Sequence, residues 1–301
     1  MMSKIFKTLK WIIFSLLCLI FVFVIVECFY FPKFLMDKEK AEISASQDDE
    51  FTVMSYNIRC HTPLDLFKRS WYYRADMVKE NIEEIGADIM GFQEITKGQY
   101  NYLVDILPDY DSVINYRDES IISEGCPLFY NTNRFELIDK GSFWLSETPD
   151  VMSKSWGSAH YRICSYINLK DKVTNKELLV FNTHLDHKSV EARVNGIKVV
   201  LDKIKEFGNK PAILMGDLNA RPNSDTIESI LEMFNDSASL ANNDLETVTY
   251  HGFDNVGAKR LDYIMLTPEK FTVESYYVYD NLKDGLYASD HSPIYAKLKL
   301  I

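Results

Sequence analysis

Polar side chains capable of chemistry follow short apolar runs at six places along this chain of 301 residues. A rigid scaffold can direct groups at the ends of strands into one shared cleft. Taken singly, each is more often a turn former or a structural residue, so the set carries the argument. The set comprises Asn57 after FTVMSY, Glu94 after DIMGFQ, His184 after LLVFNT, Asp217 and Asn219 in ILMGDLN, Asp262 in RLDYIML, and Asp290 with His291 in SDHSPI.

Carboxylates, amides and imidazoles in such a set suit the hydrolysis of a phosphoester. That reaction needs a cation on the phosphate oxygens, a positioned water and a donor for the developing charge. Mg²⁺ prefers hard oxygen ligands and keeps several waters, so one or two carboxylates suffice to hold it. Glu94 is therefore the first candidate metal ligand, with Asn57 and Asp290 beside it. We expect Mg²⁺ as the cofactor, with Mn²⁺ as an alternative.

The same segments match, in order, the motif series SYNIR, FQE, NTHLD, GDLN, RLDYI and SDHSP. In this series the chain resembles the endonuclease/exonuclease/phosphatase superfamily, the group that contains deoxyribonuclease I and the bacterial sphingomyelinases. The resemblance runs from Phe51 to the last strand. It implies a four-layer α/β sandwich, with two central mixed β-sheets flanked by helices and the active site at one edge.

The resemblance also implies roles for individual residues. Asp217 would orient or deprotonate the attacking water, and Asn219 would hydrogen-bond the phosphate. His184 and His291 would bind the scissile phosphate, each held by a carboxylate: Asp262 for His291, and Glu124 in SEGCPLFY for His184.

Arg162 opens the run RICSYINL and matches a phosphate-contacting arginine of deoxyribonuclease I-like enzymes. A surface charge at a strand edge is an equally weighted alternative for it. The remaining histidines match no catalytic motif and are interpreted as structural or peripheral: His61, His160, His187 and His251.

The elements that must position these groups can be read from hydrophobic periodicity. Runs rich in β-branched and aromatic residues predict strands at 51–56, 88–92, 126–130, 162–169, 178–183, 211–215, 261–266, 272–279 and 293–299. Helical periodicity around 77–85, 100–107 and 190–207 lies between them. Many strands mixed with helices predict sheets packed on each other with the helices outside.

The N-terminal segment differs from the rest of the chain. Three lysines precede an apolar run from Trp11 to Val26, which reaches the ~20 residues needed to span a bilayer when the following aromatic cluster is included. Lysines on that side favour a cytoplasmic N-terminus. We expect a signal anchor over 1–31, a polar tether over 32–50 and a catalytic domain over 51–301. The domain would be extracytoplasmic on a single-pass anchor, or secreted if the segment is a cleaved signal.

The net charge of the chain limits the kinds of partner that it can attract. Beyond residue 40 the chain holds 27 Lys/Arg and 41 Asp/Glu, a formal charge of −14, which makes it a poor general trap for nucleic acid. The leading hypothesis is still an extracytoplasmic nuclease or broad phosphodiesterase acting on a phosphodiester, either nucleic acid or a phospholipid head group. The alternatives are a sphingomyelinase-like enzyme and a membrane-anchored binding module without catalysis. No protein partner is inferred, and a monomer is expected.

A phosphoinositide 5-phosphatase is disfavoured. Those enzymes resemble one another in a motif with tryptophan and cysteine before the late aspartate, where this chain reads GAKRLDYI.

Overall fold

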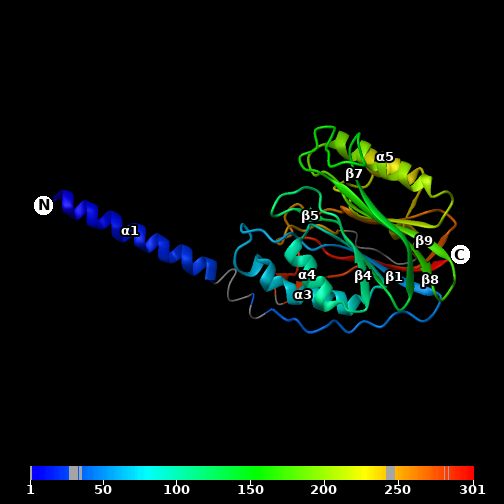
Figure 1. Ribbon diagram of the computed structural model, residues 1–301, viewed down its shortest axis with the longest axis horizontal. Coiled ribbons are helices and arrows are strands. Elements are labelled where there is room, and N and C mark those ends of the chain that lie inside the picture. The colour runs from blue at the N-terminus through cyan, green and yellow to red at the C-terminus, as the bar shows by residue number, and fades with distance from the viewer. Residues whose placement is uncertain (1, 27–32, 34–35, 242–247, 281, 284) are drawn as a thin grey trace.

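The computed structural model describes residues 2–26, 33, 36–241, 248–280, 282–283 and 285–301. Two six-stranded sheets form its centre (Figure 1). The first has the order β13-β16-β1-β2-β6-β4 and the second β11-β12-β10-β9-β8-β7. Both are mixed, because β1 pairs in parallel with β2 and β9 with β10, while the other pairs are antiparallel. The sandwich predicted from the sequence is confirmed.

The strands of the first sheet are β1 (Glu50–Asn57), β2 (Ile89–Gln93), β4 (Tyr110–Val113), β6 (Leu128–Asn131), β13 (Phe271–Val278) and β16 (Ile294–Leu300). Those of the second are β7 (Phe135–Trp144), β8 (Ile163–Asp171), β9 (Glu177–His184), β10 (Ala212–Asp217), β11 (Asn235–Asp236) and β12 (Asp262–Leu266). Two short pairs lie outside them: β3 (Ile95–Thr96) with β5 (Glu124–Gly125), and β14 (Leu282–Lys283) with β15 (Leu286–Tyr287).

Helices cover the outer face of each sheet. The main ones are α3 (Trp71–Ile85) and α4 (Lys97–Ile106) on the first sheet, and α5 (Val190–Glu206) and α6 (Asp225–Leu231) on the second. A 3-10 turn, η2 (Phe67–Arg69), precedes α3, and the short α7 is Ser237–Leu240. Ser189 begins α5 by accepting the N–H of Ala192, and Gly86 ends α3 in the left-handed conformation, as N-caps and C-caps usually do.

Alternation along the strands separates three apolar layers. In β1, Phe51 and Val53 face the other sheet, whereas Met54 and Tyr56 face α3 and α4. In β10, Ile213 and Met215 point inward and Leu214 packs under α5 and α6. Successive side chains of a strand point to opposite faces, so a strand covered on both faces reads as a continuous apolar run.

The inner face changes from apolar to polar at one edge of the sandwich. Asn57 has the inward parity of Phe51 and Val53, and Asp217 has that of Ile213 and Met215. The same parity applies to Gln93 in β2, His184 in β9 and Asp262 in β12. Five strands therefore direct polar groups into the space between the sheets at the same end.

Residues 36–49 lie along the outside of the domain, although they belong to the segment expected to be a tether. The Asp37 carboxylate binds Lys79 of α3 at 2.6 Å, and the Ala41 N–H donates to the carbonyl of Ile106. Ser46 donates to Asp88 from both its N–H and its hydroxyl. These contacts fix the segment, here called the strap, against α3, α4 and the start of β2.

The N-terminal helix is α1 (Met2–Ile25), and its side chains from Phe6 to Phe23 are exposed. Its stretch Phe6–Ile25 has a mean hydropathy of 2.6 and is long and apolar enough to cross a membrane, as a signal sequence would also be.

Candidate active site

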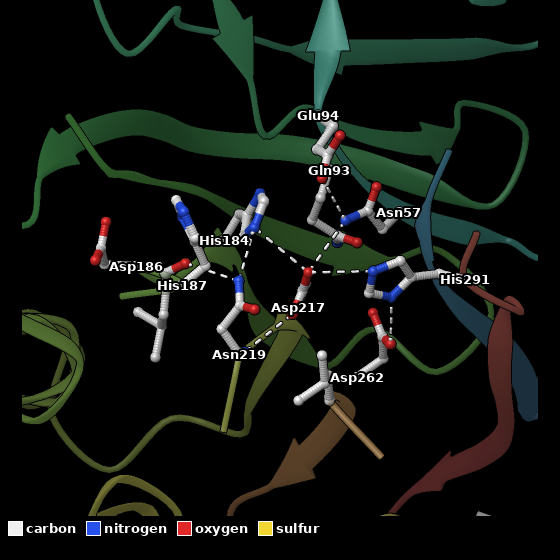
Figure 2. A network of polar contacts seen from close by, with 12 residues as sticks. Asn57, Gln93, Glu94, His184, Asp186, His187, Asp217, Asn219, Asp262 and His291 are labelled. Carbon is white, nitrogen blue, oxygen red and sulfur yellow. Dashed lines mark hydrogen bonds and ion pairs between the residues drawn. The ribbon is translucent and has the colours of Figure 1, made fainter. Parts of the chain in front are cut away.

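Asp217 is the centre of the polar network between the sheets (Figure 2). Its Oδ2 accepts the Asn57 side-chain N–H at 3.1 Å and lies 3.4 Å from His184 Nε2 and 3.6 Å from His291 Nε2. Its Oδ1 accepts the backbone N–H of Asn219 at 2.9 Å. The side chain is 2% exposed. A carboxylate held by so many donors has one fixed orientation, which positioning of a water requires.

Gly216 allows β10 to bring Asp217 to this place. Its φ is +140°, and a Cβ there would lie 1.9 Å from the carbonyl oxygen of Thr183 in β9. Any side chain would therefore force β10 away from β9, and with it Asp217 away from His184. The glycine of the GDLN motif is required by close packing of the two strands.

Asp217 and Asn219 both reach the site, but strand alternation is not the reason. β10 ends at Asp217, and Asn219 has φ +47°, in the left-handed region. The turn lets the Asn219 side chain donate to His184 Nε2 at 2.9 Å and to the carbonyl of Leu185 at 3.1 Å. An extended segment, in which side chains at i and i+2 point to one side, therefore does not describe how the GDLN motif directs Asp217 and Asn219 into the site.

His291 is held between two carboxylates. Its Nδ1 lies 2.8 Å from Asp262 Oδ2, and its Nε2 faces Asp217. Asp262 is itself fixed by the Thr249 hydroxyl, which donates to Oδ2 at 2.5 Å. Burial opposes the charged ring, but Asp262 and Asp217 outweigh it and raise the pKa of His291 to about 10. The imidazole is therefore a cation at neutral pH.

His184 has the opposite character. Burial, with the nearby charges of Arg162 and Arg117, holds its pKa well below the usual value. Its Nε2 accepts the N–H of Asn219, as an unprotonated nitrogen must. The site thus contains one neutral and one charged imidazole.

Glu124 lies in the same pocket but binds Arg117, not His184. Its two oxygens accept from the two terminal nitrogens of Arg117 at 2.6 and 2.9 Å. A bidentate pair of this kind occupies both carboxylate oxygens in a fixed orientation. The predicted Glu124–His184 hydrogen bond is therefore replaced in this structure by an Arg117–Glu124 pair, and Asn219 is the group that orients His184.

Glu94 and Asp290 bring further carboxylates to the pocket. Glu94 has φ +61°, and its two oxygens accept from the Asn57 side chain at 3.2 Å and from the Cys60 N–H at 3.0 Å. Burial disfavours its charge, but Arg59, Cys60 and His291 lower its pKa. Asp290 Oδ2 is 3.8 Å from Arg59, and burial and Glu94 raise its pKa. Left-handed φ at a non-glycine such as Glu94 is strain that clusters at functional sites.

Possible cation ligands fall into two groups that share no residue. Asp217, Asp262 and His291 bring one ligand atom each within 4.8 Å of one another. Because His291 Nδ1 is bound to Asp262 and the ring is charged at neutral pH, His291 would have to lose a proton before it could bind an ion. Glu94 and Asp290 add hard oxygen donors, the kind that Mg²⁺ prefers. Asn57 turns its NH₂ toward Glu94 and Asp217 and accepts the Arg59 N–H on its oxygen, so its part as a metal ligand stays a prediction.

Basic and aromatic groups complete the pocket, whose volume is about 430 Å³. Arg162 is buried, and its Nε lies 3.8 Å from Asp186 without a hydrogen-bond acceptor in the described structure. A buried donor left in this state favours an anion, which supports phosphate contact over a surface charge. Sequence reasoning did not include several wall residues: Arg59, Cys60, Arg117, His160, His187, Tyr250 and Lys259.

Two histidines that we interpreted as structural or peripheral stack on each other in this wall. The rings of His160 and His187 are 5.5 Å apart, and His187 Nδ1 is 3.4 Å from Arg162. His187 follows the NTHLD motif by one residue, a signal that could have included it. The other two pack on tyrosines, His61 on Tyr72 and His251 on Tyr287.

Asp186 acts as a structural acceptor. It binds the N–H groups of Ser189, Lys188 and Ala159 at 2.9 to 3.0 Å, which joins the start of α5 to the loop before β8. Although burial works the other way, these bonds and Arg162 lower its pKa to about 2.

Comparison with known proteins gives a consistent picture. A family model described as "Endonuclease/Exonuclease/phosphatase family" matches residues 54–291. A solved structure of an endonuclease/exonuclease/phosphatase from Bacteroides vulgatus is 33% identical, with a TM-score of 0.78, and the match covers 84% of this chain and 99% of that one. A mannosyl-6-phosphatase from Bacteroides thetaiotaomicron is also 33% identical, with a TM-score of 0.73 and coverage of 83% and 99%.

A curated relative is the CCR4-Not complex 3'-5'-exoribonuclease subunit of Kluyveromyces lactis, 24% identical over 239 residues. The match covers 64% of this chain and 29% of that protein, so the chain spans less than a third of its length.

Proposed function

This chain belongs to the endonuclease/exonuclease/phosphatase family, and from that membership we propose that it is a Mg²⁺-dependent phosphodiesterase whose reaction occurs in the pocket between the sheets. The observation that carries the proposal is the convergence on Asp217: an amide, a neutral imidazole and a charged imidazole all lie within 3.6 Å of one carboxylate oxygen. These are the groups that hydrolysis by water needs.

Asp217 is suited to take a proton from the attacking water. Burial, with Asp262 and Glu94 adding to it against the influence of His291, raises its pKa to about 7. A base with a pKa near the working pH gives the best combination of protonation state and proton affinity. As the water oxygen bonds to phosphorus, the proton lost by water goes to Asp217. The ester bond breaks, the leaving oxygen takes a proton from the charged His291, and Asp217 can return its proton to His291 Nε2, 3.6 Å away.

The other side chains bind and orient the phosphate. His291 offers a charged donor from Nε2, and Asp262 holds its ring. Arg162 offers a further donor on the His184 side of Asp217. The Asn219 side chain already donates to His184 and to Leu185, so it would bind the phosphate only by exchanging one of these hydrogen bonds. A Mg²⁺ ion held by Glu94 and Asp290 would supply positive charge to the phosphate oxygens.

The substrate that fits best is a small phosphodiester or a head group. A pocket of about 430 Å³ encloses a compact phosphoester better than a duplex, and the acidic domain does not attract nucleic acid in general. A nuclease is the second candidate, favoured by the exoribonuclease relative. A phosphomonoester of a sugar is the third, favoured by the mannosyl-6-phosphatase.

We further propose that α1 anchors the chain in the cell membrane by a single span, with the domain outside the cytoplasm. Its hydropathy and its exposed surface support this, and a cleaved signal leading to secretion is the alternative.

Assay of the full chain in detergent against DNA, RNA, sphingomyelin, mannose 6-phosphate and bis(4-nitrophenyl) phosphate, with and without Mg²⁺, tests the proposal. We expect Mg²⁺-dependent hydrolysis of the aryl phosphodiester, and of at least one natural substrate at a higher rate. If a folded chain with the family's site intact hydrolyses none of these substrates, a catalytic role is refuted. The membrane-anchored binding module without catalysis is then the function that is left.

A further inference from the structure

Three loops beside the pocket carry exposed apolar side chains; two of them have wall residues at both ends, and one follows wall residues at its N-terminal end. We call residues 61–69, 118–123 and 251–258 the mouth loops. The first follows Arg59 and Cys60 of the pocket wall, and its Leu64 is 86% exposed and Phe67 53% exposed. Large apolar groups therefore stand in solvent within a few residues of the site.

The other two mouth loops repeat the pattern. Arg117 and Glu124 of the wall enclose Ile121, which is fully exposed, and Ile122, which is 63% exposed. Tyr250 and Lys259 of the wall enclose a third loop whose Val256 is 75% exposed.

The concentration of these side chains distinguishes them from ordinary surface residues. Exposed apolar residues scattered singly are normal, but apolar groups gathered on one part of a surface and rimmed by polar residues mark an interaction site. Here six, with Leu66 at 40% exposed included, lie on three loops beside one pocket. A flat protein interface would offer a continuous packed face, whereas separate aliphatic tips suit a fluid apolar phase.

The path of the strap indicates which apolar phase lies close to the mouth loops. At its N-terminal end, Asp37 contacts Asp76 and Lys79 in the middle of α3. The start of α3, within a turn of Asp76, adjoins the site, because Arg74 donates to the carbonyls of Ile58 and Ala288. The strap therefore begins at the edge where the pocket opens.

From there the strap runs to the opposite edge and the chain returns. Ser46 binds Asp88, just before the start of β2, and Glu50 then starts β1, which ends at Asn57 in the site. The connection from Val26 to Met36 is ten residues, which reach at most ~36 Å. A membrane spanned by α1 is thus joined to the pocket edge by a short connection.

We infer that the mouth loops dock on the bilayer that α1 spans, so that the pocket faces phosphoesters carried at the membrane surface. The inference rests on the proposed function, because it requires α1 to be retained as an anchor and the pocket to be catalytic. The mouth loops hold Lys68 and Arg69 but also Asp118, Glu119 and Asp254. Docking is therefore apolar in origin and does not require anionic lipid.

Photo-crosslinking of the full chain in phosphatidylcholine vesicles tests the contact directly. A benzophenone amino acid replaces Ile121, Val256 or, as the control, Val173. Val173 is 43% exposed in the turn between β8 and β9, at the opposite end of β9 from His184. We expect lipid adducts at 121 and 256 at least about tenfold above those at 173. Equal labelling at all three positions, or adducts with protein alone, would overturn the inference.

A pair of substrates with the same reacting group separates docking from catalysis. The double variant Ile121→Ser with Ile122→Ser should hydrolyse 4-nitrophenyl hexadecyl phosphate in the vesicles about tenfold more slowly. Its rate on soluble bis(4-nitrophenyl) phosphate should stay within about twofold, and Val173→Ser should alter neither. Equal losses on both substrates would contradict docking. If the wild-type chain hydrolyses neither substrate, the proposed function is refuted. The docking inference is then tested by the lipid adducts alone.

Discussion

At the scale of single residues, the site works through pairs in which one side chain fixes another. Asp262 binds His291 Nδ1 and is fully buried behind the imidazole ring. Its contribution is therefore the charge and orientation of that ring. Asn57 similarly holds Glu94 and Asp217 together from one NH₂ group.

Asp262 and His291 should behave as one unit under mutation. Asp262→Asn and His291→Ala should each lower kcat/KM by about 10²-fold, and the double variant should be hardly worse than the poorer single, because residues that act together have non-additive effects. The measurement is kcat/KM per folded molecule. Asp236→Asn, which breaks a pair with Arg260 just before β12, is the control that alters stability only. Losses that add on the logarithmic scale would contradict the coupling.

Glu124 should act through Arg117 and not through His184. Its replacement, Glu124→Gln, weakens the hold on Arg117, so we expect KM to rise several-fold while kcat stays within about threefold. His184→Ala should instead lower kcat by about 10²-fold. Steady-state kinetics of both variants show whether Glu124 acts through Arg117 or through His184. A fall in kcat of equal size for the two variants would identify Glu124 as the residue that orients His184.

At the scale of elements, strand ends set the site and loops complete it. All nine predicted strands are present. Central strands such as β2, β10 and β12 are buried on both faces and read as apolar runs, whereas β16 and the edge strand β13 are only partly buried and were found from their alternation and their β-branched and aromatic residues. β7 was not predicted: it is an edge strand with a register shift between Leu137 and Asp139, and exposed charged residues interrupt its pattern.

The same contrast explains which site residues could be predicted. Strand-end groups such as Asp217 follow a clear apolar strand pattern, so the sequence identified them as site residues. Arg117 and His160 lie in loops, whose paths no local sequence pattern determines. The partner of Glu124 was mistaken for this reason. The choice between Arg117 and His184 depends on how the loop before β5 folds over the pocket.

Asp186 should stabilise the junction of α5 with the preceding loop in a pH-dependent way. Its pKa is lowered to about 2 in the folded chain, against about 3.9 when unfolded. The stabilisation is thus fully present above about pH 4 to 5 and is lost as pH falls toward 2. Asp186→Asn should lower the free energy of unfolding by about 1–2 kcal/mol at pH 7.

Unfolding curves at pH 7 and at pH 2.5 measure this effect. The difference between wild type and Asp186→Asn should shrink at the lower pH, and the exposed Asp150→Asn should show no difference at either. A pH-independent loss would mean that the charge of Asp186 is unimportant.

At the scale of the whole molecule, the strap runs from the pocket edge of the acidic domain to the opposite edge, and β1 then returns to the site. The strap is bound along its length, at Lys79, Ile106 and Asp88. With α1 kept as the proposed anchor, these contacts would restrict how the domain turns relative to the membrane.

Topology can be tested on intact cells with a membrane-impermeant amine reagent. The exposed lysines of α5, Lys198 and Lys205, should be labelled while the chain sediments with membranes. If the N-terminal segment is an uncleaved anchor, the membrane-bound chain should still contain α1. Recovery of the mature protein in the medium, with an N-terminus beyond Val26, would show secretion after signal cleavage.

The central claim is that the inter-sheet pocket hydrolyses phosphoesters with a divalent cation held through Glu94. The most direct measurement is hydrolysis of bis(4-nitrophenyl) phosphate by wild type and Glu94→Gln, titrated with Mg²⁺ from a chelated start. Glu136→Gln on the exposed edge strand β7 is the matched control. We predict no activity in EDTA, a saturable Mg²⁺ response in wild type and control, and a loss of about 10²-fold or more in Glu94→Gln at unchanged thermal stability. Full activity in EDTA, or in the folded Glu94→Gln chain, would contradict the claim.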